Sequence, residues 1–162
     1  MFSLRRMHRD RSDMPIYSEL YNQDTFYRVF TKDLNLSQRE VIIESPFITA
    51  KRMAMLLPIF TKLRQRNVRI IVNTRNPDEH DDMYRAQALE AVADMQMLSV
   101  KILYTSGHHR KLVVIDRQVV YEGSLNILSF NDSYEIMRKM TSETLARQLI
   151  RFIAIDKYIK EF

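Results

Sequence analysis

Residues 107–126 read GHHRKLVVIDRQVVYEGSLN, and this stretch determines the fold more than any other. Two mainly apolar runs, Lys111–Asp116 and Val119–Glu122, are separated by a short polar connection. Such runs on either side of a short turn are typical of two strands joined in a tight hairpin. The two glycines of the chain, Gly107 and Gly123, stand at the outer ends of these runs, where the backbone often needs their conformational freedom. The sequence therefore predicts a hairpin with a turn at each outer end.

An extended backbone at the start of this hairpin would place two reactive side chains on one face. If residues 110–116 form a strand, alternate residues point to opposite sides, so His109, Lys111 and Val113 share one face. An imidazole and an ammonium group would then point the same way. His109 and Lys111 are therefore the first candidates for chemistry.

Helices and strands alternate on both sides of the hairpin. Apolar residues at helical spacing predict four helices, at Tyr17–Lys32, Arg52–Gln65, Asp82–Met97 and from Thr141 or Ser142 to about Lys160. Apolar or alternating runs predict four further strands, at Val41–Ile43, Val68–Val72, Val100–Tyr104 and Tyr134–Met140. This alternation is typical of the α/β class, and we expect a layered mixed β-sheet flanked by helices on both faces. Residues 1–162 should form a single domain, with 1–36 as an N-terminal helical extension and 37–162 as the core.

The composition excludes several classes of protein. With 46% hydrophobic residues among 162, the chain can bury a real core and is not a disordered segment. No apolar run reaches the length of about 18 residues needed to cross a bilayer, and Met1–Asp13 lacks the apolar centre of a signal peptide, so we expect a cytoplasmic protein. The absence of cysteine removes disulfides, thiolate nucleophiles and zinc–thiolate sites. The net charge of +5 weakly favours a polyanionic partner.

The residues around the hairpin suit the cleavage of a phosphodiester. This reaction needs a nucleophile, a proton donor for the leaving oxygen, and hydrogen-bond donors for the non-bridging oxygens. Imidazole can serve as the nucleophile or as the general acid near neutral pH, because its unperturbed pKa is about 6.5. Lys111 and the amide of Asn126 can supply fixed positive potential. A site of this kind works without a metal, and we expect no cofactor.

The spacing of these residues resembles the HKD signature of the phospholipase D superfamily. The pattern His-x-Lys-x4-Asp-x6-Gly-Ser-x-Asn matches at six positions, namely His109, Lys111, Asp116, Gly123, Ser124 and Asn126. The run Val41–Phe47 also resembles the strand and turn near the start of that family's domain. The likeness extends from Val41 to the C-terminus, and it implies a phospholipase D-like domain with a single HKD motif.

The resemblance implies a two-step displacement. His109 would attack phosphorus to give a phosphohistidine, a second histidine would protonate the leaving group, and water would release the product. Lys111 and Asn126 would hold the phosphate oxygens. An acidic residue after the asparagine would orient the nucleophile, and Glu135 is the candidate, with Asp132 behind it.

Three further residues receive lesser roles. Asp116 would support the catalytic group without acting as its base. Ser124 would donate a hydrogen bond near the phosphate or simply form a turn. His108 is interpreted as the exposed neighbour of His109, able to touch the substrate.

A single motif leaves the site one histidine short. The family's working site uses two such motifs, so the second His109 must come from another copy across a two-fold axis, and we expect a homodimer. The most favoured function is a nuclease acting on DNA or RNA, a hydrolase of ester bonds. The alternatives are a non-catalytic module that binds nucleic acid and dimerises within a helicase or restriction system, and a phospholipid phosphodiesterase.

Other charged groups permit two interpretations. Glu79–Asp82 is either a metal cluster or, as is more common, the acidic first turn of a helix. Six basic residues near the strand ends either follow a phosphate backbone or form a solvated surface, and these are Lys51, Arg52, Arg64, Arg66, Arg69 and Arg75.

Overall fold

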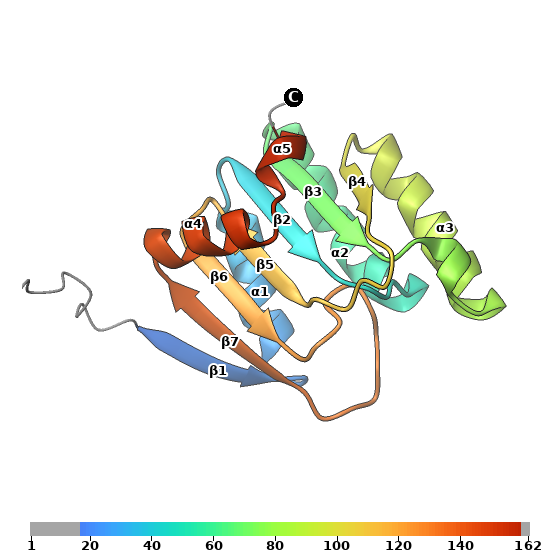
Figure 1. Cartoon of the computed structure of the whole chain (residues 1–162), viewed down its shortest axis with the longest axis horizontal. Helices are drawn as coiled ribbons and strands as arrows, with labels where there is room; N and C mark the ends of the chain where they lie inside the picture. Colours follow the sequence, from blue (N-terminus) through green and yellow to red (C-terminus); the bar gives the residue numbers. More distant parts are fainter. Residues whose placement is uncertain (1–16, 160–162) are drawn as a thin grey trace, which may run out of the picture.

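The apolar runs of the sequence form the centre of a single sheet. Strands β2 (Glu40–Glu44), β3 (Arg69–Thr74) and β5 (Leu112–Ile115) are buried along nearly their whole length. A computed structural model describes residues 17–159 and shows these strands side by side between two layers of helices (Figure 1). Strands covered on both faces are expected to be continuously apolar, as these are.

The remaining elements complete a seven-stranded mixed sheet. In chain order they are β1 (Ser18–Asn22), α1 (Phe26–Leu36), α2 (Ala50–Gln65), the short 3-10 helix η1 (Pro77–Glu79), α3 (Asp82–Met97), β4 (Lys101–Tyr104), β6 (Val119–Gly123), β7 (Ile136–Thr141), α4 (Glu143–Phe152) and α5 (Asp156–Ile159). The strand order is β1-β7-β6-β5-β2-β3-β4. Strands β2, β3 and β4 are parallel, and every other neighbouring pair is antiparallel.

Each face of the sheet has its own hydrophobic core. Helices α1, α2 and α3 pack on one face, where Phe30, Phe60 and Met95 meet Val41 and Tyr121. Helices α4 and α5 cover part of the opposite face through residues such as Ile150 and Ile159. The prediction of a layered α/β fold with helices on both faces is therefore confirmed (Figure 1).

The predicted hairpin is confirmed as β5 and β6. Residues 116–118 connect the two strands, and the first two of them, Asp116 and Arg117, have positive φ angles of 52° and 57°. The N–H of Gln118 donates to the carbonyl of Ile115 and closes the turn. Two consecutive left-handed residues are typical of the type I′ turn, whose twist matches that of the paired strands. The strands pair from Leu112 opposite Glu122 to Ile115 opposite Val119.

The helix predicted over Tyr17–Lys32 is wrong in its first part. Ser18–Asn22 forms β1, an edge strand paired with β7, and the helix begins only at Phe26 and continues to Leu36. Backbone pairing with a distant strand outweighs the weak local helical preference here. The described part of the segment 1–36 therefore contains both a helix and a strand, and the strand belongs to the main sheet. Residues 1–16 lie outside the described part.

The final predicted helix is interrupted. It begins as expected after Ser142, whose side chain accepts a hydrogen bond from the N–H of Leu145, but it ends at Phe152. Ala154 has a φ of 54°, and α5 starts at Asp156. The break allows both Ile153 and Ile155 to be buried against the sheet, which a continuous helix would not. Lys160, the predicted end, lies outside the described residues.

One end of the sheet collects the loops that matter for chemistry. The carboxyl ends of β2, β3 and β4 point to it, and β5 and β7 begin there while β6 ends there. In open α/β sheets this carboxyl end is where ligands bind. The opposite end carries the Asp116–Arg117 turn.

Candidate active site

The loop between β4 and β5 carries His109 to the carboxyl end of the sheet. Gly107 has a φ of 63°, a conformation that disfavours any residue with a Cβ atom. The turn at Gly107 reverses the chain so that residues 108–111 run back into β5. His109 is exposed on this loop and Lys111 is half-buried.

His109 and Lys111 are in contact, as their alternation predicts. The Lys111 Nζ lies 3.0 Å from His109 Nδ1 and 3.4 Å from Nε2, and it donates to the His109 carbonyl at 2.7 Å. Burial lowers the pKa of Lys111, and the nearby carboxylate of Glu135 opposes this change. An ammonium group is thus held beside the imidazole, with a carboxylate close by.

The loop after β6 brings the predicted serine and glutamate together. The Ser124 hydroxyl donates to the Glu135 carboxylate and accepts from the N–H of Ile136 at 3.0 Å. Glu135 also accepts from Ser133 at 2.6 Å. Gly123 allows this approach, because a Cβ there would lie 2.0 Å from the carbonyl oxygen of Ile136. Ser124 therefore has a structural role in the turn, next to the groups proposed for catalysis.

Asn126 borders a small cavity beside this group. The cavity has a volume of about 120 Å³, and its lining includes Glu135, Tyr27, Arg52 and Phe130. The guanidinium carbon of Arg52 lies 3.4 Å from the centre of the Tyr27 ring. The Asn126 Oδ1 is buried and has no hydrogen-bond partner among the residues that the structure describes. A buried acceptor without a partner is expected to bind a ligand donor or an ordered water.

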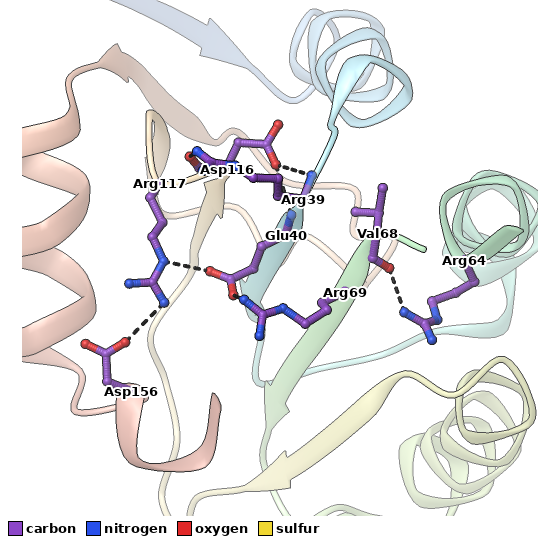
Figure 2. Close-up of polar contacts among 8 residues, drawn as sticks. All are labelled: Arg39, Glu40, Arg64, Val68, Arg69, Asp116, Arg117 and Asp156. Atoms are coloured by element: carbon purple, nitrogen blue, oxygen red, sulfur yellow. Dashed lines mark hydrogen bonds and ion pairs between the residues drawn. The ribbon is translucent and has the colours of Figure 1, made fainter. Parts of the chain in front are cut away.

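Asp116 does not belong to this group. It lies at the opposite end of β5, where its carboxylate accepts from the backbone N–H groups of Gln38, Arg39 and Glu40 at 2.8, 2.8 and 2.9 Å. Figure 2 shows Asp116 beside Arg39 and Arg117, at the amino end of β2. Asp116 therefore stabilises the fold, because the length of β5 separates it from His109 and Lys111.

The interpretation of His108 as the exposed histidine is wrong. Its exposed fraction is 3%, and its Nε2 has no hydrogen-bond partner within residues 17–159. Burial lowers the pKa of His108, while the carboxylate of Glu44 acts in the other direction. Adjacent residues of an extended segment point to opposite sides, so an outward His109 requires an inward His108.

The six basic residues split between the two ends of the sheet, and most hold backbone carbonyls. Arg64 donates to the carbonyls of Leu98 and Val68, and Arg66 donates to that of Ser37. These contacts lie at the end away from His109, as the Arg64–Val68 pair in Figure 2 illustrates. Lys51, Arg52 and Arg75 lie at the carboxyl end, so only these three can face a substrate at His109.

Sequence reasoning missed Glu44, the residue beneath the His109 loop. It ends β2, it is fully buried, and its carboxylate binds Arg110 and the amide of Asn73. The available signal was an acidic residue directly after a buried apolar run, since a buried charge requires a partner.

Two residues of the acidic segment Glu79–Asp82 accept hydrogen bonds from backbone N–H groups. Glu79 accepts from the N–H of Gly107 at 2.9 Å, and Asp81 accepts from that of Tyr84 at 3.0 Å at the start of α3. Across residues 17–159, no group of three or more His, Asp or Glu side chains is arranged to hold a metal ion. In the same part of the chain, every helix is too short or too polar to cross a bilayer.

Comparison with known proteins gives one family and several similar folds. Residues 30–156 match the family described as cardiolipin synthase, PLD-like domain. Nuc from Salmonella typhimurium, a phospholipase D family member, is 12% identical with a TM-score of 0.68, over 85% of this chain and 91% of Nuc. NucT from Helicobacter pylori is 13% identical with a TM-score of 0.63, over 85% and 93%. The archaeal chromatin protein TrmBL2 is 10% identical with a TM-score of 0.60, over 94% and 55%. No curated protein matches the sequence.

Proposed function

This chain belongs to the phospholipase D-like family of phosphodiesterases, and from that membership we propose that it is a metal-independent nuclease. Its substrate would be DNA or RNA, and its site would be shared by two copies of the chain. The observation that carries the proposal is the contact of Lys111 with His109 next to the Ser124–Glu135 pair. These four side chains come from two loops at one end of the sheet, the loop before β5 and the loop between β6 and β7.

The chemical steps follow from these groups. A ring nitrogen of His109 attacks phosphorus and forms an N–P bond, while the P–O bond to the leaving oxygen breaks. The leaving oxygen takes a proton from a second imidazole. Water then attacks the phosphohistidine, passes its proton to that second imidazole, and frees His109. Lys111 and Asn126 would stabilise the negative charge on the non-bridging oxygens, and Glu135 would orient the charged groups around them.

The second imidazole is proposed to be His109 of another copy. The inward-facing His108 is unsuitable as the acid, because its ring is buried under the loop. His80 is also unsuitable, since it packs against Phe47 and Tyr84. A homodimer with two-fold symmetry would form one site on its axis, and that site would contain both His109 imidazoles, one as nucleophile and one as acid.

Nucleic acid as the substrate is supported by the groups next to the site. Phe130 is 42% exposed at the rim of the Asn126 cavity, and Lys51 Nζ lies 3.5 Å from the centre of its ring. An exposed ring can stack on a base while the neighbouring cation binds a phosphate. The basic net charge favours the same partner. Of the similar folds, TrmBL2 binds DNA.

One observation favours a phospholipid as a second candidate substrate. A groove of about 510 Å³ beside Lys111 is lined by several apolar residues, among them Leu20, Ile136 and Phe152. Phe152 is 81% exposed. An apolar surface next to a phosphate site suits an acyl chain.

The test is cleavage by purified protein in the presence of EDTA. Labelled single-stranded DNA, double-stranded DNA, RNA and phospholipid vesicles are compared, each with wild type and with His109→Ala. We expect cleavage of nucleic acid by wild type and a loss of at least about 10³-fold in the variant. Equal cleavage by both proteins contradicts the catalytic assignment. Turnover of vesicles alone selects the lipid candidate, and binding of nucleic acid without cleavage selects the non-catalytic module.

A further inference from the structure

Strand β2 ends in a carboxylate that is completely removed from water. Glu44 has an exposed fraction of 0%, and a buried charge is costly unless it is paired and hydrogen-bonded. Arg110 supplies the opposite charge and two hydrogen bonds, one from Nε and one from Nη2 at 3.0 Å. Asn73 Nδ2 donates a further hydrogen bond at 2.9 Å. The cost of burial is thus offset by one residue of the His109 loop and one of β3.

The two chain neighbours of His109 are fixed in place by contacts with other parts of the fold. Arg110, the next residue, is bound by Glu44, and the ring of His108, the previous one, is buried close enough to Glu44 for its charge to affect the pKa. The His108 carbonyl accepts two hydrogen bonds from Arg75, at 3.1 and 2.9 Å. Between these contacts, His109 is the side chain that points outward.

We propose that Glu44 is a positioning residue for the reaction, acting through Arg110 and the His109 loop. This proposal rests on the proposed function of His109. Glu44 lies beneath the loop, is fully buried, and forms hydrogen bonds with Arg110 and Asn73. Its effect would be to restrict where the imidazole and Lys111 stand relative to phosphorus, and a shift of about 1 Å in such a geometry can cost about 10²-fold in rate.

The same strand offers a matched control. Glu40, at the opposite end of β2, is 2% exposed and is also paired with arginines, Arg69 at 2.8 Å and Arg117 at 3.1 Å (Figure 2). Its partners hold the hairpin turn and α5, since Arg117 also pairs with Asp156. Glu40 and Glu44 are therefore alike in burial and pairing, and they differ in their distance from His109.

The experiment compares Glu44→Gln with Glu40→Gln. Both variants should lower the melting temperature, because each removes the charge of a buried pair. Glu44→Gln should also lower kcat by about 10²-fold with little change in KM, while Glu40→Gln should keep the wild-type kcat. A wild-type kcat in Glu44→Gln, or the same loss in both variants, overturns the proposal. If Glu44→Gln does not fold, Arg110→Gln should reproduce the loss of kcat, and its failure to do so is equally decisive.

A second measurement separates this proposal from the proposed function. The imidazole signals of His109 in NMR spectra should be sharp in wild type and in Glu40→Gln, and broadened or split in Glu44→Gln. If wild type cleaves no phosphodiester, the proposed function fails, but these signals still decide whether Glu44 orders the loop. Identical signals in all three proteins overturn the positioning role.

Discussion

His108 and His109 are neighbours in the chain with opposite environments. One imidazole is buried over Glu44 and the other is exposed beside Lys111. The alternation of an extended segment requires them to diverge, but it does not say which of them faces inward. That choice depends on Glu44, Arg110 and Asn73, which come together only in the folded protein.

The burial of His108 predicts a dependence of stability on pH. Burial lowers its pKa below the ordinary value of 6.5, so unfolding takes up a proton when the pH lies between the folded and the unfolded pKa. Stability should therefore be fully present above about pH 6.5 and decline as the pH falls. His108→Gln should remove part of this decline, measured as the urea midpoint at pH 7.5 and 5.5.

The His108→Gln variant should still lose some stability as the pH falls, because burial also lowers the pKa of His80. His80→Gln is the matched control and should remove a separate part. If wild type and His108→Gln lose the same stability on acidification, the buried imidazole is not the group that takes up the proton.

At the scale of elements, the β5–β6 hairpin shows that a motif residue can lie far from the side chains that share its motif. The strand pattern placed Asp116 at the end of the first strand of the hairpin, and it gave no sign that the carboxylate would accept from the backbone of Gln38 and Arg39, before β2. The carboxylate joins the turn to that segment at the end of the sheet away from His109. A spacing pattern conveys neither the direction of a side chain nor what it meets.

Asp116→Asn should therefore reduce stability and leave cleavage unchanged. Asparagine tolerates the positive φ of this position and keeps one acceptor oxygen, but it loses the charge that accepts from three N–H groups. The expected loss in the free energy of unfolding is about 1–2 kcal/mol, measured by urea denaturation. A loss of kcat greater than about tenfold in a folded protein would contradict the structural role and indicate that Asp116 takes part in catalysis.

For the whole molecule, the sheet order explains why distant segments meet. Strands β5, β6 and β7 are adjacent in the antiparallel half, so the loop before β5 lies next to the loop between β6 and β7. This adjacency sets His109 and Lys111 beside Ser124 and Glu135. One copy contributes one such group, and the proposed reaction requires a second imidazole.

The proposed homodimer predicts how inactive subunits affect activity. Wild type and His109→Ala are combined in equal amounts under conditions that exchange subunits. If each site needs the imidazole of both copies, only dimers of two wild-type chains cleave, and about one quarter of the activity should remain. Independent monomers would retain about one half. Sedimentation of each mixture reports whether dimers are present, so a dimer that retains half the activity would contradict the shared site.

The sequence by itself determined the α/β class, the hairpin and the resemblance to the phospholipase D superfamily, because side-chain periodicity, turn residues and motif spacing are local properties. It did not determine that Ser18–Asn22 is a strand, because its backbone partners in β7 lie near the other end of the chain. Nor did it reveal Glu44 beneath the His109 loop or the inward face of His108. Only the tertiary structure decided these, since they depend on which segments pack together and on the need to pair every buried charge.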